Sequence, residues 1–376
     1  MIISRTIQKN IFDSLANEQK IIVIYGARQT GKTTIAREVI KELGLKTLLI
    51  NADQQKYIDV LSSKDINTLK ALTDGYDLVF IDEAQRVPDV GINLKILHDE
   101  LPDLKIIATG SSSFDLAKKI SEPLTGRKKV FNLLPISQQE LLGLQNKFEL
   151  ASKSSEFLIF GSYPEVSTKI SFEKKQEIIE EIGNSYLFKD VIELTNIKYP
   201  NKARDLLRLL AFQVGSEVSI HELSKSLKLN HETVDSYISL FEKTFIVFRL
   251  SGFSRNLRKE VTKMDKIYFW DLGIRNLLIN NFSSVELRND TGQLWENFIV
   301  TERLKYLTNN RISTNTYFWR TYTGSELDYV EERAGKIYGF EIKFGNKKPK
   351  APKTWTDTYQ ASYELINKEN YLDFLT

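Results

Sequence analysis

The sequence has 376 residues, 41% of them hydrophobic and 27% charged, which is the composition of a folded globular protein of about two to three domains. It contains no cysteine, and this excludes disulfide bonds, thiolate zinc sites and cysteine nucleophiles. The 52 basic and 49 acidic side chains nearly balance, so any surface that binds nucleic acid has to be local.

Neither a membrane segment nor a secretory signal is expected. The apolar runs are far shorter than the ~20 residues that a membrane-spanning helix needs. The first residues reach Arg5 after three apolar side chains, so they lack the apolar core of a signal peptide. We therefore expect a protein of the reducing cytoplasm without a membrane partner.

The first third of the chain alternates short β-rich runs with amphipathic segments. The runs lie at 21–25, 47–50, 78–81, 105–108 and 129–134. This alternation predicts an α/β unit with a mostly parallel sheet. Beyond 150 the pattern becomes helical, and short β-rich runs return after 290.

The run at 21–25 is followed directly by GARQTGKTT, which fits the phosphate-binding pattern G-x-x-x-x-G-K-[ST]. The two pattern glycines allow the backbone to turn its N–H groups toward phosphate oxygens, and the next helix adds the positive end of its dipole. Lys32 is expected to contact the β- and γ-phosphates, and Thr33 to bind Mg²⁺. The predicted nucleotide-binding residues of this loop are Gly26, Ala27, Arg28, Gln29, Thr30, Gly31, Lys32, Thr33 and Thr34.

Two acidic residues, Asp82 and Glu83, follow the buried run at 78–81. Asp82 is expected to hold Mg²⁺ through water, and Glu83 to orient and deprotonate the attacking water. The pair indicates ATP hydrolysis, although a small-molecule kinase could use the same loop. GTP is disfavoured because the sequence lacks the guanine-reading N-K-x-D pattern and has no D-x-x-G in the place of the acidic pair.

Three further residues are candidates for contact with the γ-phosphate. If the strand at 105–108 lies between the other two, Thr109 or Ser111 faces this phosphate and senses it, and an ordinary Gly-Ser turn is the alternative. Arg127 could stabilise the transferring phosphate, within the chain or across a subunit contact. The alternative for Arg127 is a surface charge.

These motifs, in this order, resemble those of the predicted AAA+-superfamily ATPases of archaea and bacteria that carry a C-terminal domain of unknown function. The matching phrases are GARQTGKTT, LVFIDEAQ, ATGSSS and LTGRKKVFNLLPISQQE, then YPEV, YLFKDV, IYFWDLGIRN and the WEN…ELDYVEE…EIK ending. The resemblance covers nearly the whole chain. It implies an ATPase core that uses ATP and Mg²⁺, a winged helix and a nuclease-like tail.

The patterns and the resemblance together predict the fold class and the domains. We expect an α/β P-loop NTPase with an AAA+/ASCE-type parallel sheet over 1–145 and a helical connector over 146–203. A winged-helix domain is expected over 204–285 and a restriction-endonuclease-like α/β domain of the PD-(D/E)xK type over 286–376.

The winged helix is predicted from helical patterns at 204–213, 220–229 and 230–244, with Asn230 as the N-cap of the last, followed by two strands. A basic wing can lie along phosphates, but acidic side chains on the last helix oppose DNA, and many winged helices bind proteins. The basic residues of the wing are Arg255, Arg258, Lys259, Lys263 and Lys266, and its acidic residues are Glu260 and Asp265. The acidic side chains on the last helix are Asp235 and Glu242.

Charged residues near the C-terminus resemble the PD-(D/E)xK nuclease core. Asp328 shares a strand face with Glu326, and Glu341 and Lys343 share a face of the next strand. Asp328, Glu341 and Glu296 would hold Mg²⁺, and Lys343 would support the attacking water or the phosphate. The alternative is a domain that keeps these residues but no longer cuts.

We expect an ATPase that acts as a nucleotide-gated switch on nucleic-acid binding or on Mg²⁺-dependent DNA cleavage. The alternative is a signalling or scaffold ATPase whose C-terminal domains bind a protein partner and are catalytically inactive. Both functions are compatible with a homo-oligomer.

Overall fold

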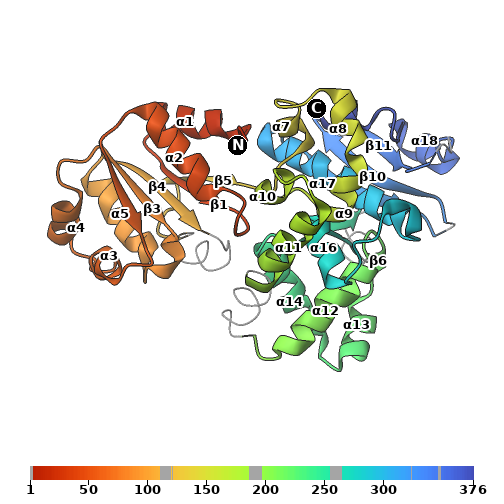
Figure 1. Cartoon of the computed structure of the whole chain (residues 1–376), viewed down its shortest axis with the longest axis horizontal. Helices are drawn as coiled ribbons and strands as arrows, with labels where there is room; N and C mark the ends of the chain where they lie inside the picture. Colours follow the sequence, from red (N-terminus) through yellow and green to blue (C-terminus); the bar gives the residue numbers. More distant parts are fainter. Residues whose placement is uncertain are drawn as a thin grey trace. The chain divides into compact units, whose positions relative to one another are not determined.

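The computed structural model describes residues 3–110, 120, 122–185, 197–254, 265–322, 324–345 and 349–376, which form two compact units. The N-terminal unit comprises Ile2–Leu134 with Lys243–Phe245, and the C-terminal unit comprises Pro135–Glu242 and Ile246–Thr376 (Figure 1). The first division therefore lies at 134/135, ahead of the boundary that we expected at 145/146.

The N-terminal unit is built from alternating strands and helices. In chain order its elements are α1 (Ile7–Asn17), β1 (Ile21–Tyr25), α2 (Lys32–Leu43), β2 (Thr47–Asn51), α3 (Gln55–Leu61), α4 (Ile66–Thr73), β3 (Leu78–Asp82), η1 (Ala84–Arg86), α5 (Val90–Glu100), β4 (Lys105–Gly110) and β5 (Lys128–Asn132). The five strands are parallel and lie in the order β2-β3-β4-β1-β5. All five runs predicted from the sequence are strands of this sheet.

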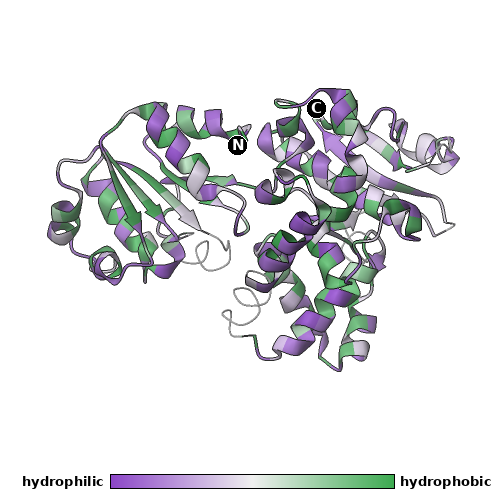
Figure 2. Cartoon of the chain, viewed as in Figure 1, coloured by the Kyte–Doolittle hydropathy of each residue, from purple (hydrophilic) through white to green (hydrophobic). Residues whose placement is uncertain are grey.

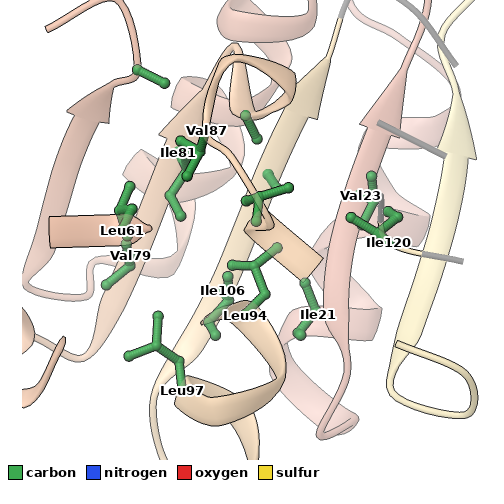
Figure 3. Close-up of a cluster of buried hydrophobic side chains, with 14 of the residues drawn as sticks. Ile21, Val23, Leu61, Val79, Ile81, Val87, Leu94, Leu97, Ile106 and Ile120 are labelled. Atoms are coloured by element: carbon green, nitrogen blue, oxygen red, sulfur yellow. The ribbon is translucent and has the colours of Figure 1, made fainter. Parts of the chain in front are cut away.

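Both faces of this sheet are buried under helices. Ile22 and Ile24 of β1 pack in one cluster with α1 and α2, whereas Ile21 and Val23 pack on the other face with Leu94 of α5 (Figure 3). A strand buried on both faces needs a continuous apolar run, which is why the central strands β1, β3 and β4 show no alternation of polar and apolar residues. In Figure 2 the central strands of this unit accordingly have hydrophobic colours.

The C-terminal unit is mainly helical at its start and carries most of its strands near its end. Its elements are α7 (Gln138–Leu141), α8 (Lys147–Ser152), α9 (Ser154–Phe160), α10 (Pro164–Ser167), α11 (Phe172–Ile182), α12 (Pro200–Phe212), β6 (Glu217–Val218), α13 (Ile220–Leu227), α14 (His231–Lys243), β7 (Val247–Gly252), β8 (Asp265–Phe269), α16 (Leu272–Leu278), η3 (Val285–Leu287), α17 (Thr291–Asn309), β9 (Asn315–Arg320), β10 (Glu326–Arg333), β11 (Lys336–Ile342), α18 (Lys353–Tyr359), β12 (Ser362–Ile366) and α19 (Tyr371–Leu375).

Seven strands of this unit form one sheet in the order β12-β11-β10-β9-β7-β8-β6. Parallel pairing of Ser251 with Tyr317 and of Gly252 with Phe318 joins β7 to β9. The domain boundary that we expected at 285/286 therefore lies between strands of a single sheet. One face of β9, β10 and β11 packs against Trp355 of α18 in an aromatic cluster.

Helix α17 runs through the interior of the C-terminal unit. It has 19 residues, and its buried side chains include Glu302, Arg303 and Lys305. Buried charges need partners, and Arg303 pairs with Glu331 of β10 at 2.6 Å. In the described part of the chain, no helix combines the length and the apolar character needed to cross a membrane.

Ile107 in β4 tests how far the N-terminal sheet depends on its core. The side chain is fully buried, so Ile107→Ala should lower the stability of this unit by about 2–5 kcal/mol. Leu49→Ala is the matched control, since Leu49 is 50% exposed and its loss should cost only about 0.5 kcal/mol.

The measurement is urea unfolding of the full chain. All 4 tryptophans (Trp270, Trp295, Trp319 and Trp355) lie in the C-terminal unit, so their fluorescence follows that unit while circular dichroism follows both. Ile107→Ala should shift the circular dichroism transition more than the fluorescence transition. Equal effects of the two substitutions would contradict the described core.

Candidate functional site

The phosphate-binding loop begins after Tyr25, the last residue of β1, and ends where α2 begins. A side chain at Gly26 would collide with the backbone oxygen of Leu133, so this position requires glycine. Gly31, directly before α2, has a φ of 94°, which glycine adopts at low cost. The structure thus places the predicted loop residues 26–34 between β1 and the first turn of α2.

The side chain of Lys32 folds back over the loop. Its Nζ donates to the backbone oxygens of Gly26 (3.0 Å) and Ala27 (2.8 Å). Burial lowers the pKa of Lys32 to about 8, although the charges of Glu83 and Asp82 favour the ammonium form. Phosphate oxygens, which are charged, would be stronger acceptors for this ammonium than the two carbonyls.

Arg5 supports the loop from the start of the chain. Its Nη1 donates to the backbone oxygen of Thr30 (2.9 Å), and Nη2 donates to that of Leu134 (2.6 Å). Sequence reasoning gave Arg5 no role in the site, because these partners lie 25 and 129 residues away and no local pattern points to them.

Asp82 lies at the carboxyl end of β3. Its Oδ2 accepts a hydrogen bond from the Thr33 hydroxyl (2.8 Å), and its Oδ1 accepts one from the Thr109 hydroxyl. The hypothesis for Thr109 required β4 to lie between β1 and β3, and the strand order has it there. Ser111, the other candidate sensor, lies outside the described residues.

The oxygens of Thr33 and Asp82 fit a Mg²⁺ site. Mg²⁺ prefers hard oxygen ligands, and in nucleotide sites it takes only one or two from the protein and the rest from phosphates and water. A threonine hydroxyl and a carboxylate oxygen 2.8 Å apart, beside a phosphate loop, are such a donor set.

Glu83 follows β3 with a φ of 55°, which turns its backbone away from the strand direction. Its N–H donates to the Thr109 hydroxyl (3.3 Å), and its carboxylate accepts a hydrogen bond from the Gln85 amide. The structure therefore brings Glu83, Asp82 and Lys32 into one charged neighbourhood. Gln85 was missed by the sequence analysis, although it belongs to the same DEAQ segment.

Arg127 lies at the opposite edge of the sheet. Its backbone oxygen accepts a hydrogen bond from the N–H of Ile21, the first residue of β1, whereas the loop follows the last residue. Five strand residues span about 16 Å. Arg127 binds Asp99 through two hydrogen bonds (2.7 and 3.0 Å), and its guanidinium, with His98, lowers the pKa of Asp99 to about 2. The expected action of Arg127 on the γ-phosphate of its own chain is therefore wrong.

Asp328, Glu341 and Lys343 come together in the C-terminal sheet, as the sequence predicted. Lys343 Nζ lies 2.7 Å from Glu341 Oε1 and 3.3 Å from Asp328 Oδ2. Asp328 Oδ2 also accepts a hydrogen bond from the N–H of Ile342 (2.8 Å). The pairing of β10 with β9 shifts its register between Leu327 and Val330, next to Asp328.

Glu296 of α17 is bound by two residues of β8. Lys266 Nζ lies 3.0 Å from Glu296 Oε1, and the Tyr268 hydroxyl donates to the same oxygen at 2.6 Å. Burial, with the charge of Asp328, raises the pKa of Glu296 to about 7. Among the described residues no three metal-ligating side chains are grouped so that they could hold an ion. The expected metal shell of Glu296, Asp328 and Glu341 is therefore wrong for this arrangement.

The predicted basic wing is largely outside the described residues, which exclude Arg255, Arg258, Lys259, Glu260 and Lys263. Lys266 is described, and it is 6% exposed and paired with Glu296, so its expected place on a surface wing is wrong.

The helices before the wing follow the sequence prediction more closely. Asn230 accepts a hydrogen bond from the N–H of Thr233 (2.7 Å), which confirms it as the cap of α14. Asp235 and Glu242 of α14 both pair with Arg249 of β7, at 2.7 and 3.2 Å. The negative charges that oppose DNA on this helix are therefore partly neutralised within the protein.

Comparison with known families covers most of the chain. An AAA domain (AAA_14) matches residues 18–142, and two domains of unknown function, DUF8612 and DUF4143, match residues 152–285 and 291–372.

Individual proteins are also similar to this chain over most of its length. Uncharacterized protein Rv2008c of Mycobacterium tuberculosis is 30% identical over 327 residues, which cover 86% of this chain and 70% of that protein. Uncharacterized protein MJ1544 of Methanocaldococcus jannaschii is 27% identical over 302 residues, 75% of this chain and 66% of that protein. The Walker-type ATPase PABY2304 of Pyrococcus abyssi has a TM-score of 0.54 at 16% identity and covers 74% of this chain and 96% of that one. This likeness and the parallel five-stranded sheet confirm the expected P-loop NTPase fold.

The lowered pKa of Lys32 predicts proton uptake when a nucleotide binds. Phosphates favour the ammonium form, so binding should raise the pKa of Lys32 from about 8. Below pH 8 the lysine is already charged, and above it each bound nucleotide must bring a proton. Affinity for MgATP should therefore fall up to about tenfold per pH unit above pH 8.

Calorimetry in buffers of different ionisation enthalpy measures this uptake directly. We expect close to one proton per nucleotide at pH 9 and little at pH 7. Equal uptake at both pH values would contradict the described burial of Lys32.

Proposed function

Since the chain belongs to a family of AAA+ P-loop ATPases that carry two C-terminal domains of unknown function, we propose that it binds ATP with Mg²⁺ and hydrolyses it. The acceptor is water, and the γ-phosphate state gates the C-terminal unit. The observation that carries the proposal is the Asp82 carboxylate, which binds the hydroxyls of both Thr33 and Thr109 at the end of the phosphate loop.

Each side chain has a distinct task in this proposal. The loop N–H groups and Lys32 bind the phosphates, and Thr33 and Asp82 hold Mg²⁺, which would neutralise charge on the transferring group. Glu83 orients a water molecule and accepts its proton as the oxygen attacks the γ-phosphorus and ADP leaves. Thr109 lies between Asp82 and the backbone of Glu83, so it is placed to relate the metal site to the catalytic base.

The short segment at the end of the N-terminal unit supports the proposal that the bound nucleotide controls the C-terminal unit. Within that unit, the backbone oxygens of Leu133 and Leu134 contact the loop glycine Gly26 and Arg5. A few residues later, within the C-terminal unit, Lys305 of α17 donates to the backbone oxygen of Ile136 (3.2 Å).

Glu302 and Lys305 of α17 together hold the segment 136–138, and we call this pair the anchor. Glu302 accepts a hydrogen bond from the N–H of Gln138 (2.6 Å) and pairs with Lys305 (2.7 Å). Glu296 lies six residues earlier on the same helix, about 9 Å along its axis. A shift of the segment 133–138 on nucleotide exchange would thus reach α17 over few bonds.

A second function, nucleic-acid binding by the C-terminal unit, is proposed for a separate reason. Three helices with β6, β7 and β8 have the order of a winged helix, and Asp328, Glu341 and Lys343 lie together as in the nuclease core that the sequence resembles. DNA cleavage would need Mg²⁺ at these carboxylates. The competing function is protein binding by a catalytically inactive domain, and the lysines that neutralise the carboxylates favour inactivity.

Substitutions in the N-terminal site test the ATPase. Lys32→Ala should abolish nucleotide binding or hydrolysis. Glu83→Gln should bind ATP as the wild type does and lose turnover by about 10²–10⁴-fold, because only the general base is removed. ATP binding by fluorescence anisotropy and phosphate release measure the two effects, and unchanged turnover in Glu83→Gln would overturn its assignment. Phosphoryl transfer to an added acceptor instead of water would identify a kinase.

Substitution of Glu302 and Lys305 on α17 tests whether the bound nucleotide controls DNA binding by the C-terminal unit. Binding of a panel of single-stranded, duplex and branched DNAs should differ between ATP and ADP states and weaken with salt. Glu302→Gln with Lys305→Met should remove the nucleotide dependence and leave ATP turnover in place.

Glu177→Gln with Lys174→Met is the matched control, since this pair has the same spacing on α11 and its side chains are 60% and 65% exposed. It should keep the nucleotide dependence. DNA binding that is absent in every nucleotide state would favour the protein-binding function.

A further inference from the structure

We infer that Lys266 closes the carboxylate centre, defined as Glu296, Asp328 and Glu341, to divalent cations. The lysine takes the place of the metal ion that the carboxylates would otherwise bind. This inference rests on the second proposed function only for the choice of site, because metal binding can be measured whether or not DNA is bound.

The first support is the occupancy of the Glu296 carboxylate. Oε1 accepts hydrogen bonds from Lys266 (3.0 Å) and from the Tyr268 hydroxyl (2.6 Å). A carboxylate oxygen has about two lone pairs to offer, so Oε1 has none left for a metal ion. The ammonium cannot move aside easily, because Lys266 is 6% exposed and lies over the Phe318 ring at 5.5 Å.

The second support is the occupancy of the neighbouring carboxylates. Asp328 Oδ2 accepts hydrogen bonds from the Ile342 N–H (2.8 Å) and from Lys343 (3.3 Å), and Lys343 also pairs with Glu341. Donors from the protein thus already occupy one oxygen of each of the three carboxylates. With both lysines in place, the described carboxylates do not form a grouped set of metal ligands.

The charge balance points the same way. Two ammonium groups, Lys266 and Lys343, offset two of the three carboxylate charges of the centre. A divalent cation that entered would have to share the centre with both lysines and would be repelled by them. Without Lys266, the three carboxylates of the centre would face one ammonium, and neighbouring carboxylates favour a hard cation between them.

Lys266 comes from a different part of the chain than the residues it neutralises. It belongs to β8, which pairs with β6 and β7 in the region 152–285, whereas the carboxylates lie in the region 291–372. The centre is therefore a composite of both domains of unknown function. A sequence comparison restricted to the C-terminal domain contains the carboxylates and omits the lysine that neutralises them.

Mn²⁺ binding to the full-length, nucleotide-free protein tests the inference. All proteins compared, including the one that keeps Lys266, carry Asp82→Asn, which removes the carboxylate proposed to bind Mg²⁺ in the nucleotide site. Electron paramagnetic resonance of free Mn²⁺ should detect no bound ion at the centre with Lys266 present. In the same titration Lys266→Met should bind one Mn²⁺, a gain in affinity of at least about tenfold, and adding Asp328→Asn should abolish this binding.

Two controls separate charge from folding. Lys336→Met removes an exposed lysine at the start of β11 and should not create a site, and Lys266→Arg keeps the positive charge and should bind no ion. Lys266→Gln replaces Lys266→Met if the latter lowers the melting temperature strongly. Mn²⁺ binding with Lys266 present that is lost in Asp328→Asn would overturn the inference, as would a folded Lys266→Met or Lys266→Gln that binds none. Failure of DNA binding would overturn the second proposed function alone.

Discussion

The Asp82 carboxylate accepts hydrogen bonds from Thr33 and Thr109, and the nucleotide site depends on this arrangement. The three residues come from the ends of β3 and β4 and from the helix that follows β1. They can meet only because the strand order is β3-β4-β1 and all three strands run in parallel, so that their carboxyl ends share one edge. The apolar side chains of the helices on both faces pack against these strands and hold this order, so the chemistry of the site depends on the core of the sheet.

Each unit contains a buried lysine, and the two lysines differ in the source of the negative charge that balances them. Lys32 is buried against carbonyl oxygens, and burial lowers its pKa. Bound phosphates would supply the negative charge that is missing around its ammonium group. Lys266 is buried against a carboxylate, which supplies that charge within the protein. The first lysine therefore has a reason to bind an anionic ligand, and the second has a reason to remain where it is.

The parts of the fold and site that could be predicted from sequence are those fixed by neighbours along the chain. The succession of strand, glycine-containing loop and helix places Lys32 and Thr33. Pairing of the neighbouring strands β10 and β11 places Asp328 beside Glu341. Arg127 was misplaced because its edge of the sheet follows from pairing with β1, more than 100 residues away in the chain. The contacts of Arg5 with Leu134 and of Glu302 with Gln138 join residues 129 and 164 positions apart, and no periodicity signals them. Lys266 belonged to a basic run whose pattern resembles a surface wing, and only the sheet that joins β8 to β7 and β9 explains its burial.

The affinity for ATP with Mg²⁺ and with EDTA, measured for the wild type and for Asp82→Asn, tests the central role of Asp82 most directly. The account predicts that Mg²⁺ strengthens ATP binding by the wild type. It predicts that Asp82→Asn loses about 10–100-fold of this metal effect and keeps its affinity in EDTA, because the substitution removes a metal-site charge and leaves the phosphate loop in place. A variant whose Mg²⁺ enhancement equals that of the wild type would contradict the account.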